Sequence, residues 1–303
     1  MPDRVPSPAR DGSHIVCWGE LLWDLFADGP RLGGAAANVA YHVSLLGSRA
    51  RLVSRVGRDE LGKSALGLLR DAGVDVALVQ TDTKRPTGTV AVQLVGGEPH
   101  FTIVEQVAWD CIDFSEDVAR AVRSARAIVY GTIAQRTPLG FGALRSALQA
   151  AESACVRMCD LNVRPPFVAR DVIDASLTDA NVVKLTDSEA DALRELFEVD
   201  DPVSWLLEER GIELVALTRG QHGCVLQSRT ERHEHPGFPL ADSNSGDRVG
   251  AGDAFAAVLA TGLVRGTDLG TLAVRANRYA GYVASQRGAT PPMPEELLAA
   301  FAE

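Results

Sequence analysis

Residues Gly250 to Asp253 combine a bare backbone with a carboxylate. Gly250, Ala251 and Gly252 have almost no side chain, and Asp253 follows them at the start of a long apolar run with helical spacing. If the small residues form the first turn of a helix that continues from Asp253, their N–H groups point outward at the positive end of its dipole, where an oxyanion or a transferring phosphoryl group binds. Asp253 would accept a proton from an attacking hydroxyl, with a pKa that the dipole and amides keep low. The structural alternative is an ordinary helix start with an acidic first turn.

A second stretch, GRDELGKS from Gly57 to Ser64, has the form of a Walker A motif between a predicted strand and a predicted helix. Asp59 and Glu60 place negative charge where backbone amides would wrap a triphosphate, which counts against a P-loop. Asp160 is the only fair candidate for the metal-binding Asp that should end a later strand. We therefore interpret the stretch as a turn that opens a helix.

Strand-like and helical patterns alternate through most of the chain. This β-α-β order predicts an α/β domain with a mainly parallel sheet, covered by helices on both faces, and ligands in such folds bind at the carboxyl ends of the strands. Strands are predicted at 14–19, 50–57, 125–131, 154–162, 181–186, 214–220 and 223–228, and helices at 35–47, 61–73, 139–153 and through most of the chain from 253 onward.

The segment from Thr87 to Glu105 breaks this alternation. Period-two runs on each side of Gly96-Gly97 predict an antiparallel hairpin. We expect lid segments at about 24–34 and 87–107, which together form a small sheet that closes over the main domain and excludes water. The alternatives are a surface hairpin or a contact between two copies in a homodimer. Phe101 and Trp109 would stack on a flat face of a ligand or fill the seam beneath this sheet.

Composition narrows the function classes. The chain has 303 residues, 46% of them hydrophobic, and a net charge of −10. Because a nucleic-acid binder normally carries a basic excess, and no apolar run is long enough to span a bilayer, we expect neither a nucleic-acid nor a membrane partner. Residues 1–13 lack an apolar core and predict a disordered tail rather than a signal peptide, which leaves 14–303 as a single domain.

The cysteine and histidine spacings do not favour a metal site. The five cysteines are scattered, which fits reduced thiols and a cytoplasmic location. Cys155 and Cys159 have no second ligand pair for zinc. His233 and His235 flank Glu234 in a charged stretch that we interpret as a solvated turn.

Two motifs resemble the signatures of the ribokinase-like (PfkB) carbohydrate kinase family. The first is GGAAANVAYHVSLLGSRARLVSRVG, from Gly33 to Gly57, and VGRDELG resembles a turn common in this family, which explains the Walker A match. The second, DRVGAGDAF, departs from the family at Arg248, where Thr, Ser, Pro or Val is usual, and this bears on the local cation and nucleotide contacts. The resemblance covers nearly the whole chain and implies a three-layer α/β/α domain with a small β-sheet lid.

The resemblance also implies roles for individual residues. Asp253 would be the base, with the amides of Gly250, Ala251 and Gly252 as the anion hole. The implied sugar contacts are Asp24, Gly33, Gly34, Asn38 and Arg164. The implied nucleotide contacts are Lys184, Thr218, Gly220, Gly223 and Asn277. Glu189 would hold Mg2+ through water, although Thr186 replaces the family's usual Asn, and Asp247 and Val249 match the positions of a K+ site.

Structural alternatives remain for several of these residues. Asn38 would be satisfied by backbone near a helix start, Asp24 would cap a turn, and Arg164 would form a surface ion pair. Lys184 would reach phosphate or pair with Asp187.

The function that the resemblance implies is ATP- and Mg2+-dependent transfer of the γ-phosphate to a sugar hydroxyl. The segments GELLWD and DLNVR favour a fructokinase. Another sugar or nucleoside kinase, acting on 2-keto-3-deoxygluconate, ribose or adenosine, is the nearest alternative. A sugar-binding regulator without turnover is a third, and the retained Asp253 counts against it.

Overall fold

The computed structural model describes residues 13–95, 98–167, 169–238 and 246–301, and within these ranges the side chains of 92–101 are not described. The disordered tail expected at 1–13 therefore lies almost wholly outside the described residues, as does any side-chain role of Phe101.

The described residues form a nine-stranded sheet with the order β13-β12-β11-β10-β9-β8-β1-β4-β5. Its strands are β1 (His14–Trp18), β4 (Arg49–Gly57), β5 (Val79–Asp82), β8 (Ala127–Tyr130), β9 (Val156–Asp160), β10 (Val182–Thr186), β11 (Leu214–Thr218), β12 (Cys224–Gln227) and β13 (Arg232–His235). All neighbours pair in parallel except β11 with β12 and β12 with β13. The mainly parallel sheet is confirmed. The predicted turn around Glu234 is wrong, because this charged segment is an edge strand, where one side of the backbone and both faces can stay in water.

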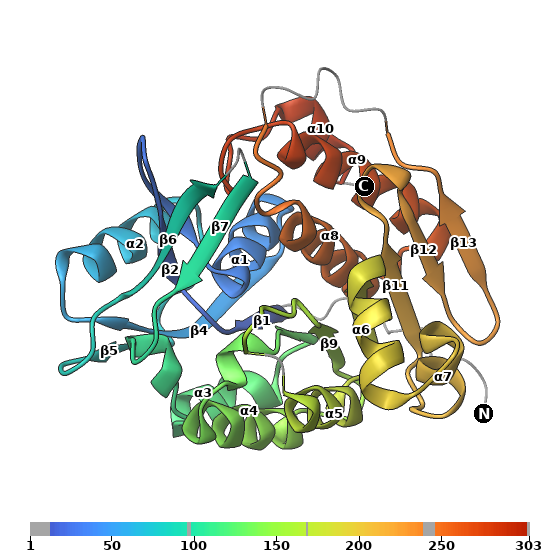
Figure 1. Cartoon of the computed structure of the whole chain (residues 1–303), viewed down its shortest axis with the longest axis horizontal. Coiled ribbons are helices and arrows are strands. Elements are labelled where there is room, and N and C mark those ends of the chain that lie inside the picture. Colours follow the sequence, from blue (N-terminus) through green and yellow to red (C-terminus); the bar gives the residue numbers. More distant parts are fainter. Residues whose placement is uncertain (1–12, 96–97, 168, 239–245, 302–303) are drawn as a thin grey trace.

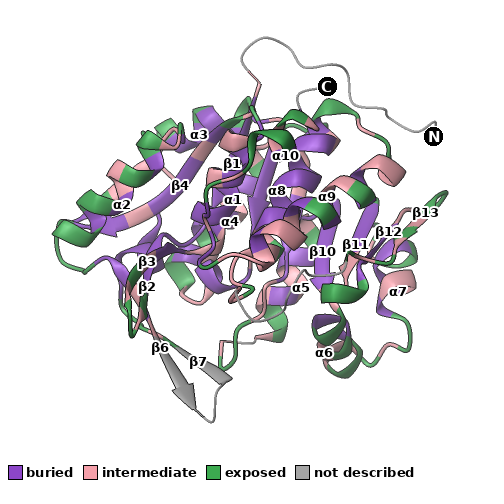
Figure 2. Cartoon of the chain, turned by 90° about the horizontal axis from the view of Figure 1, so that it is seen from above, coloured by how far each residue is buried: buried purple, intermediate pink, exposed green. Residues whose placement is uncertain are grey.

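Helices cover both faces of the sheet, as Figure 1 shows with α1 and α8 above it and α3, α4 and α5 below. Side chains alternate along β1, so Ile15 and Cys17 join one core while Val16 and Trp18 join the other. The first core is completed by α1 (Ala35–Leu45), α2 (Glu60–Asp71), α8 (Ala251–Arg265), α9 (Leu269–Ala284) and α10 (Glu295–Ala299), and the second by α3 (Glu116–Arg123), α4 (Pro138–Ala150), α5 (Arg170–Asp179), α6 (Asp187–Phe197) and α7 (Pro202–Glu208). Central strands are buried while the outer sides of α2 and α6 are exposed (Figure 2).

A separate four-stranded sheet has the order β3-β2-β6-β7. Its strands are β2 (Leu22–Phe26), β3 (Gly29–Gly33), β6 (Gly88–Val95) and β7 (Glu98–Ile103). The predicted hairpin is confirmed as the antiparallel pair β6–β7, and β2 joins it in parallel with β6. The two segments expected to form the lid therefore belong to one small sheet.

The Walker A-like stretch is a helix start whose amides are satisfied internally. Asp59 is the N-cap of α2, and its carboxylate accepts hydrogen bonds from Gly62 N at 2.8 Å, Thr87 N at 2.8 Å and Thr87 Oγ1 at 2.6 Å. Lys63 is 79% exposed and pairs with Glu60. A carboxylate of the protein thus lies where a P-loop would receive phosphate, which rules against that alternative.

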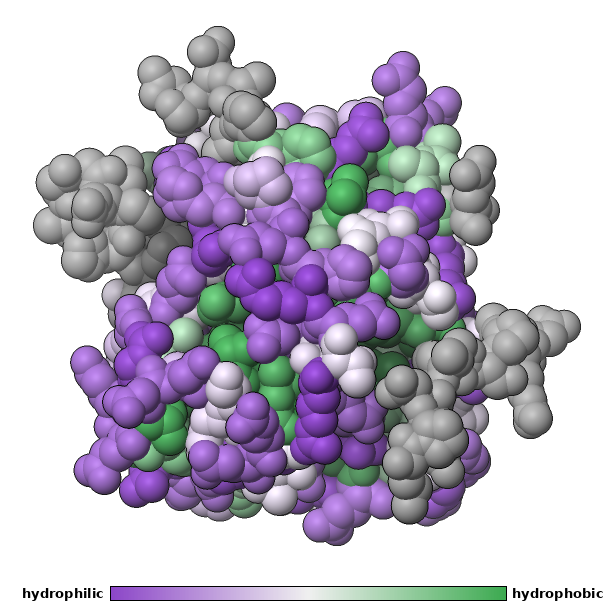
Figure 3. Space-filling view, turned by 90° about the vertical axis from the view of Figure 1, so that its right-hand side faces the viewer, coloured by the Kyte–Doolittle hydropathy of each residue, from purple (hydrophilic) through white to green (hydrophobic). Residues whose placement is uncertain are grey.

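The surface carries few apolar clusters on the side of β13. Figure 3 shows this side as mostly hydrophilic, with hydrophobic residues in small patches between polar ones. No helix among the described residues is long and apolar enough to cross a membrane. All five cysteines are buried free thiols, and the described residues contain no cluster of His, Cys, Asp or Glu that could hold a metal by itself.

Candidate active site

A cavity of about 600 Å³ lies at the carboxyl ends of the central strands and is bordered on one side by the small sheet. Parallel strands end at one edge of a sheet, so residues distant in sequence meet there. We call this space the acceptor cavity. The predicted site residues that line it are Asp24, Gly34, Asn38, Arg164, Lys184, Glu189, Asp247, Val249, Gly250, Gly252 and Asp253.

Asp253 lies in the first turn of α8 and meets Asn38 of α1. Nδ2 of Asn38 donates to Oδ2 of Asp253 at 2.7 Å, although the residues are 215 positions apart. The helix begins at Ala251 rather than at Asp253, because Gly250 takes a left-handed φ of 77° and forms the N-cap. Ala254 N donates to the carbonyl of Gly250 at 2.8 Å. Ala251 N makes a long hydrogen bond, 3.5 Å, to the carbonyl of Arg248. The amides before Ala254 stand at the helix N-terminus, where the backbone leaves N–H groups for a ligand.

The electrostatic environment of Asp253 differs from the one predicted. Its pKa is raised to about 7. Burial is the main cause and the charge of Asp160 adds to it, while the hydrogen bond from Asn38 and the charges of Lys184 and Arg164 act in the opposite direction. The predicted low pKa is therefore wrong. The dipole and amides favour the carboxylate, but desolvation in the cleft outweighs them.

Asp24 is a second carboxyl group with a raised pKa. Burial is the main cause and the charge of Asp247 adds to it, which brings the pKa to about 6. A Cβ on Gly33 would overlap the Asp24 carboxylate, and one on Gly34 would overlap the Glu20 carbonyl. The glycine pair therefore allows β3 and the start of α1 to pass close to this part of the cavity. Gly33 contacts the site through Asp24 and does not itself line the cavity.

Lys184 is paired with a different carboxylate from the one expected. Its Nζ donates to both Asp160 oxygens, at 2.8 and 2.9 Å, and both side chains are buried. Pairing with Asp187 is therefore wrong, because neighbouring strands β9 and β10 place Lys184 opposite Asp160 in register. A Cβ on Gly252 would contact Lys184 Nζ at 3.4 Å, so this ion pair lies directly beneath the first turn of α8.

Glu189 joins two loops at the edge of the acceptor cavity. Oε1 accepts from Val163 N and Oε2 from Thr186 N, each at 2.8 Å, and Thr186 Oγ1 accepts from Glu189 N at 3.2 Å. This reciprocal pair is a capping box that starts α6. Each carboxylate oxygen keeps a lone pair that can accept from water.

Arg164 lines the acceptor cavity. Arg164 is exposed, and its charge lowers the pKa values of Glu20, Asp24, Asp160 and Asp253. The alternative of a surface ion pair is not observed among the described residues, in which the Arg164 side chain forms a hydrogen bond only with the carbonyl of Val163.

Trp109 is 1% exposed and packs against the Arg136 guanidinium, 4.1 Å from the ring centroid. It fills the seam below the small sheet and still contributes an edge to the cavity.

A second cavity of about 270 Å³ adjoins the first, and we call it the nucleotide cavity. Four of the five predicted nucleotide contacts line it: Thr218, Gly220, Gly223 and Asn277. Asn277 Nδ2 already donates to Cys224 Sγ at 3.0 Å and Ala273 O at 2.7 Å, which leaves its carbonyl oxygen for a ligand. The fifth contact, Lys184, belongs to the acceptor cavity. Both cavities share Thr186, Arg248 and Gly252.

Comparison with known proteins identifies the family of this chain. A family model described as pfkB family carbohydrate kinase matches residues 21–296. The chain belongs to the PfkB family. It is therefore a carbohydrate kinase with the ribokinase-like fold.

Individual PfkB relatives cover nearly the whole chain. An uncharacterized sugar kinase of Pyrococcus horikoshii is 30% identical over 304 residues, 94% of each chain. Its crystal structure matches 95% of this chain and 97% of that one with a TM-score of 0.80. Fructokinase-1 of Oryza sativa subsp. japonica is 29% identical and covers 93% of this chain and 95% of its own. Fructokinase of Xylella fastidiosa with bound ATP has a TM-score of 0.86 over 95% of this chain and 97% of that one, and at 22% identity it supports the fold alone.

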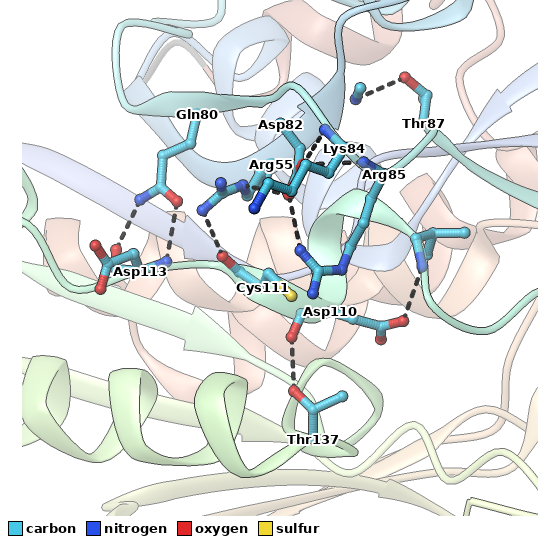
Figure 4. A network of polar contacts seen from close by, with 12 residues as sticks. Arg55, Gln80, Asp82, Lys84, Arg85, Thr87, Asp110, Cys111, Asp113 and Thr137 are labelled. Atoms are coloured by element: carbon cyan, nitrogen blue, oxygen red, sulfur yellow. Dashed lines mark hydrogen bonds and ion pairs between the residues drawn. The ribbon is translucent and has the colours of Figure 1, made fainter.

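The small sheet of this PfkB kinase is tied to the main domain by a polar network (Figure 4). Asp82 accepts the backbone amides of Lys84 and Arg85 at 2.8 and 2.9 Å and pairs with Arg55 at 3.1 Å. Arg55 also donates to the carbonyl of Cys111 at 2.9 Å. The end of β5, the approach to β6 and the 3-10 turn Ala108–Cys111, which carries Trp109, are thus joined at one point.

Sequence reasoning missed two acidic residues of the site. Glu20 lines the acceptor cavity and its Oε1 accepts Ala35 N at 3.0 Å, which fixes the start of α1. Asp160 begins the DLNVR segment, but the sequence suggested no role for it beyond that of a Walker-type metal ligand. Glu20 directly follows a predicted strand and Asp160 lies near the end of another. Because ligands bind at the carboxyl ends of parallel strands, these positions could have indicated that both residues belong to the site.

Proposed function

We propose that this PfkB kinase transfers the γ-phosphate of ATP to a sugar hydroxyl, with fructose as the first acceptor to test. The observation that carries the proposal is Asp253, a carboxyl group with a pKa of about 7, hydrogen bonded to Asn38 at the start of α8 and next to the junction of two cavities. A general base works best when its pKa is near the working pH. The likeness to plant fructokinases such as that of rice supports fructose.

In this proposal, the acceptor cavity orients the sugar. Asp24 and Asn38 bind its hydroxyl groups, together with the backbone of Gly34, while Gly33 leaves room for the Asp24 carboxylate. Asp253 receives the proton of the attacking hydroxyl. The amides of Gly250, Ala251 and Gly252 stabilise the charge on the transferring group, since phosphoryl transfer depends mainly on positioning and charge stabilisation.

The residues near Glu189 fit an Mg2+ ion held through water. Mg2+ prefers oxygen ligands, keeps several waters and is usually bound by one or two carboxylates together with substrate phosphates. Glu189 offers such oxygens at the cavity edge, and both are already oriented by backbone amides. When bound, Mg2+ would neutralise charge on the phosphate oxygens.

K+ binding at Asp247 and Val249 stays a prediction. The Asp247 carboxylate accepts hydrogen bonds from Val249 N at 3.1 Å and Gly288 N at 2.9 Å, which hold it in place. Activity in KCl compared with NaCl tests it.

A sugar acid is a second candidate acceptor, because Arg164 brings a guanidinium without an acidic hydrogen-bond partner, among the described residues, into the acceptor cavity. A guanidinium binds carboxylates bidentately. The test is a phosphorylation screen with ATP and Mg2+ against fructose, ribose, adenosine, 2-keto-3-deoxygluconate and hexose phosphates. Preference for fructose supports the first proposal, preference for the keto acid supports the second, and no phosphorylation of any acceptor contradicts both.

A further inference from the structure

Arg248 occupies the boundary between the acceptor and nucleotide cavities. Of the three residues that line both cavities, it alone carries a charge. The residue is exposed, and its guanidinium has no hydrogen bond or ion pair within the part of the chain that the structure describes. A cation at this boundary is therefore available to a ligand that extends from one cavity into the other.

The backbone of Arg248 is held in a conformation that non-glycine residues seldom adopt. Its φ is 61°, in the left-handed region. Contacts of the preceding residue, Asp247, hold this part of the backbone in place. Asp247 N donates to Gln286 O at 3.1 Å, and Asp247 Oδ2 accepts Gly288 N at 2.9 Å. A strained backbone of this kind persists only where the surrounding structure fixes it. It gives the side chain a direction that a relaxed loop would not maintain.

The other cations of the acceptor cavity do not lie at this boundary. Lys184 is bound by both oxygens of Asp160 beneath Gly252. Arg164 lines only the acceptor cavity. A triphosphate with its base in the nucleotide cavity and its terminal phosphate beside Asp253 has to cross at Arg248.

Building on the proposed ATP-dependent function, we propose that Arg248 binds the phosphate chain of the nucleotide where it crosses between the two cavities, and so aligns the terminal phosphate with Asp253. A planar guanidinium donates two parallel hydrogen bonds to phosphate oxygens, which fixes orientation as well as charge. The contact is specific to phosphates and leaves the base and the sugar acceptor to other residues.

Binding of ADP and of adenosine, measured by calorimetry with the purified chain in Mg2+ buffer, separates phosphate from base recognition. Arg248→Gly removes the guanidinium and suits the left-handed backbone, so its thermal midpoint should not fall. We expect ADP affinity to drop by about tenfold or more, as for a lost charge-assisted pair, and adenosine affinity to change by less than about twofold. The ADP affinity of Arg248→Lys should lie between those of the wild type and Arg248→Gly, because lysine keeps the charge but cannot donate two parallel hydrogen bonds.

Arg287→Ala is the matched control, since this arginine is 72% exposed and lines neither cavity. It should bind both ligands like the wild type. Unchanged ADP affinity in Arg248→Gly, or an equal loss of affinity for ADP and adenosine, overturns the inference about Arg248 but leaves the proposed function standing. A wild-type chain that binds no adenine nucleotide overturns the proposed ATP-dependent function as well.

Discussion

At Asp253, burial and hydrogen bonding act on one carboxyl group in opposite directions. Desolvation raises its pKa, whereas Asn38 stabilises the ionised form. The outcome, a pKa of about 7, gives a group that is half ionised near neutral pH. Such a base can both accept a proton readily and be present in the reactive form.

Replacing the proposed base should abolish turnover with little effect on binding. Asp253→Asn keeps the size of the side chain but cannot accept the proton, so we expect kcat to fall roughly 10²-fold or more while acceptor affinity stays within a few-fold. Coupled ADP-release kinetics and acceptor titration measure the two quantities. Asp71→Asn, at an exposed position in α2, is the control and should leave both unchanged. Near-normal kcat in Asp253→Asn would exclude the assigned role.

The same pKa predicts two pH profiles of opposite sense. Activity should rise with pH through about 7 as Asp253 ionises, and Asp253→Asn should lack this step. Stability should behave differently. Because the folded pKa lies above that of the unfolded chain, the folded state binds the proton more tightly, and the stabilisation is lost as pH rises toward 7 and beyond. In urea denaturation, the free energy of unfolding of Asp253→Asn should therefore increase relative to that of the wild type between pH 5 and pH 8. A difference that does not change with pH would contradict the raised pKa of Asp253.

At the scale of elements, the ion pair of Lys184 and Asp160 joins β9 and β10 directly beneath α8. Removing one partner leaves a buried charge alone, so Lys184→Met should lower the free energy of unfolding by about 3–5 kcal/mol. Lys184→Met combined with Asp160→Leu should recover most of this loss, because it removes both charges. Urea titrations of the single and double variants measure it. A double variant as unstable as the single one would show that packing, and not charge, is responsible.

The network around Asp82 links β5 to the base of the small sheet (Figure 4). Burial by itself would raise the pKa of Asp82, but the amides of Lys84 and Arg85 and the charge of Arg55 bring it below its usual value. Stability from this group is present above the unfolded pKa and is lost as pH falls through the lower folded value.

Asp82→Asn should lower the unfolding free energy at neutral pH by about 1–3 kcal/mol, since one charged acceptor of several hydrogen bonds is lost. Because Trp109 is carried by the same network, we also expect a higher KM for the acceptor with an unchanged KM for ATP. Steady-state kinetics with each substrate varied in turn provide the measurement. Equal changes in both KM values would argue against a local effect on the small sheet.

At the scale of the molecule, the small sheet carries exposed apolar residues that a second copy would cover. Leu25 on β2 is 40% exposed and Val104, just after β7, is 41% exposed. We expect a homodimer formed through this sheet, because exposed sheet surfaces readily pair. Sedimentation velocity should show a dimer for the wild type and a monomer for Leu25→Asp. Leu68→Asp, at a residue on α2 that is 48% exposed, should remain dimeric. A monomeric wild type would contradict the expectation.

The sequence by itself determined many of the elements and the parts of the site that depend on local pattern. Apolar periodicity identified most strands and the helices α1, α2, α4 and those from α8 onward, but not α3, α5, α6 and α7. The bare backbone before Asp253 marked the helix start that faces both cavities. The polar edge strands β5 and β13 were not predicted, since VQTD and RHEH contain no apolar run and become strands only by pairing with β4 and β12.

Tertiary structure decided the electrostatics of the site. The pKa of Asp253, the pairing of Lys184 with Asp160 and the position of Arg248 between two cavities depend on burial and on neighbours that the fold brings together, such as Asn38, 215 residues away from Asp253. Local pattern carries no information on desolvation, because the loss of water around a group depends on every element that packs against it.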